Sequence, residues 1–383
     1  MASDWQAVRD QFTVLRDWTY LNTATFGPVP RCSLEAIEEH HRRRDREACL
    51  DFLDWFDDAD GVRASAATLI GASPDDIAFV PSTGAALGWL VSGIDWKAGD
   101  QVVALQDEFP NNTYFGHGIA RRGVEFVEVP LTDGVFSLDH FLSAVGPRAR
   151  LVLMSTVNYA TGLRPPVAEI GRELRARGVL FYVDATQSLG AIQTNVGELS
   201  ASVVAAHGYK WLCAPAGIGL GWFGPEVRAW LEPSIYSWRS HRDWRNVDAL
   251  HHGPPNLPDA AVRYEGGLLN FPGVYALGAV LDLMLSLGPA AIEQRICELA
   301  AHAARVLRSA GAVLLRDRFP GYDSPILAAR FEGRDHSALA RQLRDARVVV
   351  SARHGCLRVA PHFFNNEEDL DILADRLCAC LRG

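Results

Sequence analysis

Lys210 is one of only two lysines in this chain of 383 residues, and it comes shortly after an apolar run. A lysine at the end of a buried strand loses part of its hydration, which favours the neutral amine, and a neutral amine can form a Schiff base with an aldehyde. Lys97 lies in an Asp-Trp-Lys-Ala-Gly-Asp segment typical of an exposed turn before a strand. Lys210 is therefore the candidate nucleophile.

An acidic residue, Asp184, follows the apolar run that precedes the one before Lys210. Asp184 follows the apolar run 179–183, and Lys210 follows the next one, so a carboxylate and an amine leave neighbouring strands. Open α/β sheets bind ligands at the carboxyl ends of their strands. Pyridoxal phosphate needs this pair, because a lysine forms the Schiff base and a carboxylate keeps the pyridine nitrogen protonated. The alternative role for Asp184 is the N-cap of a following helix.

The other strand ends carry groups that suit the same cofactor. The turn 81–84 is Pro-Ser-Thr-Gly before a helix, and it offers N–H groups and hydroxyls to a phosphate, although Ser and Thr also cap ordinary helices. Phe109 follows the next run, where its ring can stack on a planar cofactor or pack in the core. Asn158 follows the run that ends at Ser155, and its amide can donate to the hydroxyl of the cofactor ring.

Short apolar runs alternate with amphipathic segments through the first two thirds of the chain. The expected strands are 76–80, 101–105, 125–129, 151–155, 179–183 and 203–206, and 168–175 is expected to be a helix with its charges outward. Such alternation is typical of an α/β fold with a mostly parallel sheet and helices on both faces. Segment 236–258 has no period and is rich in Trp, His, Arg and Pro, which indicates a long functional loop.

After about Pro272 the composition changes to long segments rich in alanine and leucine. Helices are expected over 274–287, 290–310 and 337–345 and from 365 onward, with a strand-like run over 326–331. We therefore predict three parts of the chain. They are an N-terminal segment (1–20) packed on the small domain, a large cofactor-binding domain (21–271) and a small α+β C-terminal domain (272–383).

The composition limits the classes of partner. A net charge of −9 argues against a nucleic-acid binder, which needs a basic surface. Seven scattered cysteines without CxxC spacing indicate neither disulfides nor zinc, and favour the cytoplasm. No metal is expected at His241, His251 and His252, because no acidic or cysteine partner stands at ligand spacing. The longest apolar stretch, near 275–287, contains Asp282 and is too short to span a membrane.

Taken in order, these strand ends resemble the class V aminotransferase family of fold-type I pyridoxal-phosphate enzymes, which includes cysteine desulfurases, C–S lyases, an isopenicillin N epimerase and kynureninases. The resemblance runs from Tyr20-Leu-Asn-Thr-Ala24 to the C-terminal helix. Its strongest motifs are Asp184-Ala-Thr-Gln187, His207-Gly-Tyr-Lys210-Trp-Leu, Arg263-Tyr-Glu-Gly-Gly267 and Leu357-Arg-Val-Ala-Pro-His362-Phe-Phe-Asn365. The family fold has a seven-stranded, mostly parallel sheet and a smaller C-terminal domain. The resemblance also implies a homodimer with composite active sites.

The resemblance implies roles for individual residues. The expected cofactor-binding residues are Lys210 and Asp184; Gln187 and Asn158 at the ring oxygen; Phe109 over the ring; and Ser82, Thr83, Gly84, His207 and Tyr209 around the phosphate. The expected substrate-binding residues are Arg358, Arg353, Asn22 and Trp238. Arg358 suits the α-carboxylate of an amino acid, because a planar guanidinium pairs with a carboxylate through two hydrogen bonds. Arg353 is a second candidate for this role, or forms a salt bridge that closes the two domains.

Two departures from the family narrow the chemistry. Desulfurases carry a nucleophilic cysteine on a loop in the segment that corresponds to Arg353–Arg358. In this chain that segment is short, and Cys356 is expected to be a small buried residue. The family often has a threonine after the paired glycines for the opposite subunit's phosphate, whereas this chain has Leu268 after Gly267. Segment 236–244 and the paired glycines are candidates to cross into the neighbouring site.

These observations predict a lyase that eliminates a β-substituent from an α-amino acid, such as a cysteine conjugate. Transamination, epimerisation and decarboxylation or deamination remain alternatives, because substrate-facing residues select the fate; candidates are Asn22, Thr23, Tyr159 and Trp238. Cysteine desulfuration is disfavoured by the missing loop. A non-catalytic or NAD-dependent protein is the alternative from another class, but segment 217–221 fails the GxGxxG pattern and indicates close strand packing.

Overall fold

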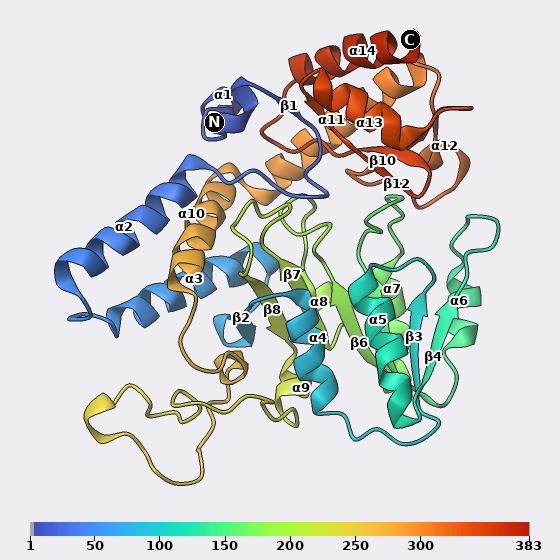
Figure 1. Ribbon diagram of the computed structural model, residues 1–383. Coiled ribbons are helices and arrows are strands. Elements are labelled where there is room, and N and C mark those ends of the chain that lie inside the picture. The colour runs from blue at the N-terminus through green and yellow to red at the C-terminus, as the bar shows by residue number, and fades with distance from the viewer. Residues whose placement is uncertain (1–3, 383) are drawn as a thin grey trace.

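A seven-stranded sheet lies at the centre of the computed structural model, which describes residues 4–382 (Figure 1). Across the sheet the strands are β2 (Ile77–Val80), β8 (Gly219–Phe223), β7 (Val203–His207), β6 (Leu180–Asp184), β5 (Ala149–Ser155), β3 (Gln101–Leu105) and β4 (Glu125–Val129). Strand β8 is antiparallel to both neighbours, and the other pairs are parallel. The predicted mostly parallel α/β sheet is confirmed, and the predicted strand ends are correct to within two residues.

Both faces of this sheet are buried, which explains why its strands are nearly continuous apolar runs. The helices of this part are α4 (Thr83–Ser92), α5 (Pro110–Ile119), α6 (Leu138–Ala144), α7 (Val167–Ala176), α8 (Val196–Leu199) and α9 (Pro225–Arg228). On one face, Val102 and Leu153 share a core with α4 and α5. On the other face, Val103 and Val152 share a core with α6 and α7. Because successive side chains of a strand point to opposite faces, each strand packs against helices on both sides of the sheet.

Glycines in β8 allow three strands to pack closely. A Cβ atom at Gly219 would lie 2.4 Å from the carbonyl oxygen of Ala206 in β7. A Cβ atom at Gly221 would lie 2.9 Å from Val80 Cγ1 in β2. Segment 217–221 thus serves close strand packing, as its pattern indicates, and it fixes β7 next to the turn that carries Lys210.

Three long helices form a layer beside the sheet, at the left of Figure 1. They are α2 (Arg31–Glu47), α3 (Asp54–Ile70) and α10 (Phe271–Leu287). Helix α10 packs against both of the others, and Ser33 Oγ donates to the Ala276 carbonyl at 2.7 Å. Val280 and Leu281 of α10 belong to the same core as the sheet. Although the sequence places α10 in the small domain, this helix packs on the large one.

The small domain lies at the top of Figure 1. Its elements are α11 (Pro289–Ser309), β9 (Val313–Leu314), α12 (Leu315–Arg318), β10 (Leu327–Arg330), α13 (His336–Asp345), β11 (Val348–Val349), β12 (Ser351–Arg353), β13 (Cys356–Val359) and α14 (Glu367–Arg382). Four strands form an antiparallel sheet in the order β12–β13–β10–β9. Leu299, Leu327 and Leu373 share one apolar core, so helices and sheet stabilise each other.

The described part of the N-terminal segment packs on the small domain. Strand β1 (Thr19–Tyr20) pairs in parallel with β11. Arg9, the last residue of α1 (Trp5–Arg9), forms an ion pair with Asp369 of α14 at 2.7 Å. The ring of Phe12 lies 4.5 Å from that of Phe364. Of the predicted segment 1–20, residues 1–3 lie outside the described residues.

Helices α10 and α11 are the candidates for a membrane span. Within residues 4–382, no single helix is both long and apolar enough to cross a bilayer. The two helices meet the criterion only when taken together, and they are bent by 83° relative to each other. Leu277, Val280 and Met284 of α10 are buried inside the protein.

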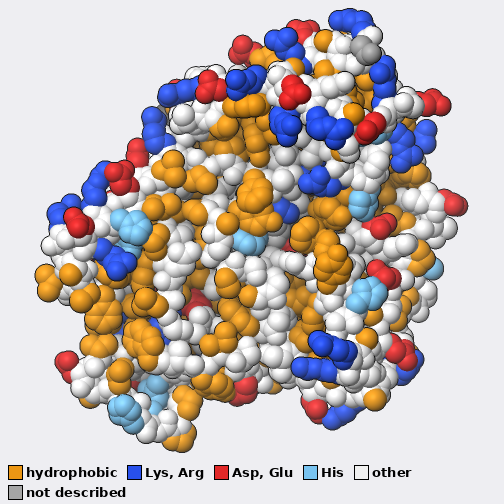
Figure 2. Space-filling view, viewed as in Figure 1, with side chains coloured by type: hydrophobic (Ala, Val, Ile, Leu, Met, Phe, Trp, Pro, Cys, Tyr) orange, Lys and Arg blue, Asp and Glu red, His pale blue; other side chains and the backbone are white. Residues whose placement is uncertain are grey.

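Segment 236–258 is a long loop, as its composition indicates, with one short 3₁₀ turn at Val247–Ala249. It extends away from the sheet at the lower left of Figure 1. Several apolar side chains on or beside it are exposed, among them Ile235, Tyr236 and Leu268. Figure 2 shows apolar side chains spread over the lower part of the same face, whereas charged side chains gather over the small domain.

Candidate active site

A pocket of about 370 Å³ lies where β3, β5, β6 and β7 end. Its lining residues are Thr83, Phe109, Asn111, Ser155, Tyr159, Asp184, Thr186, Gln187, His207, Tyr209 and Lys210. Parallel strands end at the same edge of a sheet, so side chains far apart in the sequence meet there. Seven of the ten expected cofactor-binding residues line this pocket, and Ser82, Gly84 and Asn158 are the exceptions.

Lys210 lies three residues beyond the end of β7 and is only 5 % exposed. Its Nζ atom is 5.0 Å from the centre of the Phe109 ring. Burial lowers the pKa of Lys210 to about 8, while the carboxylate of Asp184 opposes this shift. Part of the amine is therefore neutral near physiological pH, as Schiff-base chemistry requires. Lys97 is exposed and forms an ion pair with Asp95 at 2.5 Å, as expected for a surface lysine.

Asp184 is the last residue of β6, and its Oδ1 atom accepts from the Thr186 N–H at 2.9 Å. The next helix begins only at Val196, so the alternative role as a helix N-cap is wrong. Gln187 accepts from the Trp211 indole at 2.8 Å and donates to the Ala24 carbonyl at 3.0 Å. These bonds fix the amide of Gln187 at the pocket wall and leave it one further N–H to donate.

Helix α4 begins at the end of the pocket that is expected to hold the phosphate. Ser82 Oγ caps this helix by accepting from the Ala85 N–H at 3.1 Å, while Thr83 Oγ1 accepts from Asn111 at 3.2 Å and faces the pocket. His207 Nδ1 is buried and has no hydrogen-bond partner among the described residues. An unpartnered buried nitrogen beside a helix N-terminus suits an anionic oxygen ligand. The residues present therefore fit a phosphate group.

Asn158 lies behind the pocket wall. Its Nδ2 atom donates to the Asp107 carbonyl at 2.8 Å, and its Oδ1 atom accepts from the N–H groups of Ala160 and Thr161 at 2.9 and 3.0 Å. These bonds build a turn and leave Nδ2 one further N–H to donate, so the expected contact with the ring oxygen stays a prediction. That turn presents Tyr159, the next residue, to the pocket.

Glu108 is a buried site residue to which the sequence analysis assigned no role. It accepts from the N–H and Oγ of Ser155 at 2.7 and 2.5 Å and from Asn112 Nδ2 at 3.0 Å. Burial raises its pKa, and the nearby carboxylate of Asp184 adds to this shift. Glu108 thus ties the end of β3 to the end of β5. A carboxylate three residues after the end of an apolar strand was the available signal.

Arg358 lies in β13, is 1 % exposed, and contacts the pocket through Tyr159, which lines it. Its guanidinium donates only to uncharged oxygens, which belong to Ser351, Tyr159, Asn22 and Thr25. Within residues 4–382, no carboxylate forms an ion pair with it. Burial lowers the pKa of Arg358 to about 9, so the group stays charged at neutral pH. A buried cation without an anion is costly, and an amino-acid carboxylate would compensate it.

Of the remaining candidate substrate-binding residues, some lie near Arg358 and others lie elsewhere. Asn22 is buried and contacts Arg358, as expected for the same site. Arg353 donates to the Ala352 carbonyl at 2.7 Å and makes no ion pair within the described part of the chain, so the alternative role as a domain-closing salt bridge is not seen. Thr23 is fully buried. Trp238 lines a separate hollow in the long loop, which leaves it outside the Lys210 pocket of its own chain.

Cys356 confirms the prediction of a small buried residue, since it is 2 % exposed and burial raises its pKa. It pairs directly with Arg353 across a two-residue turn between β12 and β13. A cysteine on such a short hairpin cannot swing toward a substrate.

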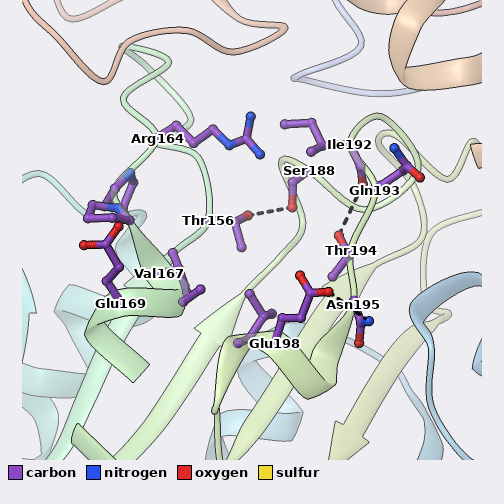
Figure 3. Close-up of a pocket in the computed structure, with 14 residues that line it drawn as sticks. Thr156, Arg164, Val167, Glu169, Ser188, Ile192, Gln193, Thr194, Asn195 and Glu198 are labelled. Carbon is purple, nitrogen blue, oxygen red and sulfur yellow. Dashed lines mark hydrogen bonds between the residues drawn. The ribbon is translucent and has the colours of Figure 1, made fainter. Parts of the chain in front are cut away.

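A second hollow, of about 790 Å³, lies next to the same strand ends (Figure 3). Thr156 and Ser188 meet at its floor through a 2.7 Å hydrogen bond. Each follows a residue of the Lys210 pocket, Ser155 and Gln187. Thr156 also holds the Asp184 carbonyl through its N–H at 3.0 Å, so this wall supports the residue that ends β6.

Similarity to known proteins agrees with this arrangement. The chain matches the model of the class-V aminotransferase family over residues 25–373. It is 30% identical to isopenicillin N epimerase from Streptomyces clavuligerus, over 98% of each chain. It is 27% identical to a probable cysteine desulfurase from Methanothermobacter thermautotrophicus, over 97% of this chain and 96% of the relative.

Solved structures show the same fold. A cysteine desulfurase from Thermococcus onnurineus NA1 has a TM-score of 0.87 at 22% identity, with 100% of each chain covered. The cystine C–S lyase C-DES, in complex with cysteine persulfide, has a TM-score of 0.87 at 22% identity, covering 96% of this chain and 99% of the other. The family predicted from the strand-end motifs is thus confirmed. The chain belongs to the class-V aminotransferase family and is a pyridoxal-phosphate-dependent enzyme.

Proposed function

We propose that this enzyme is a lyase that eliminates a β-substituent, such as the sulfur group of a cysteine conjugate, from an α-amino acid. The observation that carries the proposal is the buried guanidinium of Arg358, which is charged and has no carboxylate partner in residues 4–382. An α-carboxylate would supply the missing anion. It would also bring the α-carbon of the substrate toward Lys210.

The chain's own residues provide the remaining steps. Lys210, whose amine is partly neutral because its pKa is about 8, removes the α-proton as a general base. Pyridoxal phosphate, when bound, withdraws electrons from the α-carbon. Asp184 supplies a carboxylate for the ring nitrogen, and Thr83 and His207 supply polar atoms for the phosphate. Phe109 provides an apolar cover that keeps water from the ring.

The hairpin between Arg353 and Arg358 favours simple elimination over cysteine desulfuration. Desulfuration needs a thiolate that can reach the substrate sulfur, and reactive thiolates are exposed with a lowered pKa. Cys356 is buried and its pKa is raised by that burial. The leaving group would therefore depart without transfer to an enzyme cysteine.

Epimerisation at the α-carbon is the second candidate. It is supported by the 30% identity to isopenicillin N epimerase over 98% of both chains. Both reactions begin with removal of the α-proton by Lys210. They differ afterwards, because elimination breaks a bond at the β-carbon, whereas epimerisation returns a proton to the other face of the α-carbon.

One experiment separates these outcomes. Purified protein loaded with pyridoxal phosphate is incubated with cysteine S-conjugates, and pyruvate, ammonia and the configuration of the remaining substrate are measured. Release of pyruvate is expected, and Lys210→Ala should abolish it because the general base is lost. Inverted substrate without pyruvate would establish the epimerase instead. Amino transfer that depends on an added keto acid would disprove both.

We also propose that the enzyme acts as a homodimer in the cytoplasm. Exposed apolar side chains at Ile235, Tyr236 and Leu268 favour a partner surface on the long loop and the segment that follows it. Trp238 lies in the same region, away from the Lys210 pocket of its own chain. The seven cysteines are free of disulfides, which suits a reducing compartment.

A further inference from the structure

Tyr159 and His354 form a hydrogen-bonded pair at the mouth of the Lys210 pocket. Tyr159 Oη and His354 Nε2 are 3.0 Å apart, and the two rings meet edge to face with their centres 5.6 Å apart. Tyr159 lines the pocket, and its ring also meets Phe109 edge to face at 5.2 Å. His354 is exposed. The pair therefore connects the interior of the pocket with bulk water.

Tyr159 is fixed next to the group that we expect to hold the substrate. The guanidinium of Arg358 donates to the Tyr159 carbonyl oxygen. The Asn158 side chain closes the turn by accepting from the N–H groups of Ala160 and Thr161, the two residues after Tyr159. An amino acid bound through Arg358 therefore has Tyr159 as an immediate neighbour. Burial raises the pKa of Tyr159, so its phenol carries a proton at neutral pH.

His354 is held by a tight turn of the small domain. It joins β12 to β13 together with Gly355, and the two residues have φ angles of 45° and 69°. Two positive φ angles in a two-residue hairpin are the pattern of a type I′ turn, which favours Asn-Gly, Asp-Gly or Gly-Gly. A histidine is a less favourable choice at the first position. The hydrogen bond between His354 and Tyr159 explains the histidine, because the turn places an imidazole of the small domain against the large domain.

We propose that Tyr159 is a catalytic acid of the elimination and that His354 is the relay residue that returns its proton from water. The proposal rests on the proposed function. Lys210 takes the α-proton, and the electrons of that C–H bond form the double bond between the α- and β-carbons. The bond from the β-carbon to sulfur breaks with its electron pair on sulfur, which takes the proton of Tyr159. His354 then donates a proton to the Tyr159 oxygen and regains one from water.

Leaving-group dependence tests the role of Tyr159. With an S-alkyl cysteine, whose thiolate leaving group needs a proton, Tyr159→Phe should lower kcat by about 10²–10⁴-fold, the range typical of general acids. With β-chloroalanine, whose chloride leaves without a proton, the same variant should lose less than about tenfold. Tyr114→Phe, which changes an exposed tyrosine on α5, is the matched control and should behave like the wild type. Equal losses with both substrates would show a structural role and overturn the proposal.

A measurement without substrate tests the coupling of the pair. Histidine ring ¹⁵N NMR of the cofactor-loaded protein is recorded, with the His354 signals identified from His354→Gln. Tyr159→Phe should shift the Nε2 resonance, because it removes the hydrogen-bond partner, and Tyr114→Phe should not. An unchanged resonance would overturn the relay. If wild-type protein releases no pyruvate, the proposed elimination fails, and the NMR result still decides whether the relay exists.

Discussion

Lys210 lines the pocket and Arg358 contacts the pocket residue Tyr159. Both are buried cations, and burial lowers the pKa of both. The charge states that result differ, because the ordinary pKa of an arginine is higher than that of a lysine. The pKa of Lys210 falls to about 8, so its amine exchanges protons near neutral pH, while that of Arg358 falls only to about 9 and leaves it cationic. One environment therefore supplies both a base and an anion-binding group. The nearby carboxylate of Asp184 limits the shift of the lysine.

The pH at which Lys210 reacts follows from its lowered pKa. In cofactor-free protein, reductive methylation with formaldehyde should label Lys210 half-maximally near pH 8, with the amine protonated and unreactive below that value. Because the chain has two lysines, mass spectrometry of two peptides separates Lys210 from the exposed control Lys97. Labelling of Lys210 that begins only at strongly alkaline pH would contradict a lowered pKa.

Arg358 should be needed for recognition of the carboxylate. Arg358→Met should lower kcat/KM for amino-acid substrates by about 10²–10³-fold, because a buried anion loses its charged partner. Arg353→Met is the matched control and should have a much smaller effect, since Arg353 is only half-buried. The two kcat/KM values check this, and a larger loss for Arg353→Met would reverse the assignment. Lysine-bound cofactor, seen by its visible absorbance, should remain in both variants.

At the scale of elements, three buried charged side chains attach the long loop to helix α3 and strand β2. The side chain of Glu265 is fully buried between Arg63 of α3, at 2.7 Å, and Arg239 of the loop, at 3.1 Å. Glu265 also accepts from the N–H of Phe79 in β2 at 2.8 Å, and Arg239 donates to the Gly267 carbonyl at 2.8 Å. This cluster joins the loop and the paired glycines to β2, the strand that leads into the turn 81–84.

Removal of the central charge should therefore be costly. Glu265→Gln leaves the buried guanidinium of Arg239 without an anion and leaves Arg63 with only the exposed carboxylate of Asp60, 3.4 Å away. The free energy of unfolding should therefore fall by roughly 3–5 kcal/mol. Asp95→Asn breaks the exposed pair with Lys97 and should leave stability unchanged within error. Urea unfolding followed by fluorescence measures both variants. A neutral Glu265→Gln substitution would mean that the cluster does not stabilise the fold.

Element positions were predicted well where one period dominates. Six of the seven strands of the central sheet and helices α7, α11, α13 and α14 follow clear apolar patterns, whereas the glycine-rich strand β8 had no strand prediction. Helices α2 and α3 had no prediction, and in the charged helix α2 only Ser33 and His40 are fully buried, so its apolar signal is weak. Asn158 and Trp238 show the same limit at the site, since residue type alone does not tell which atoms a side chain contacts.

At the scale of the whole molecule, Trp238 tests whether sites are shared between subunits. Lys210→Ala and Trp238→Ala subunits, each impaired alone, are mixed and allowed to re-associate. If Trp238 serves the partner's pocket, random dimers should regain about a quarter of wild-type activity, because half the dimers carry one intact site. No recovery would place Trp238 outside the partner's site, and a monomer by light scattering would disprove the dimer.

The sequence by itself determined the sheet, the family and the lysine–carboxylate pair, because strand periodicity and the polar residues after each strand are local signals that parallel topology brings to one edge. Tertiary structure decided which atoms each side chain contacts and how deeply it is buried. Asn158 is used inside a turn, Glu108 joins two strands, and Arg358 is a buried cation without an anion in residues 4–382. Tyr159 and His354, 195 positions apart, meet only because the small domain lies over the pocket. Burial and long-range contacts set pKa values and hydrogen-bond partners, and neither is encoded in a local pattern.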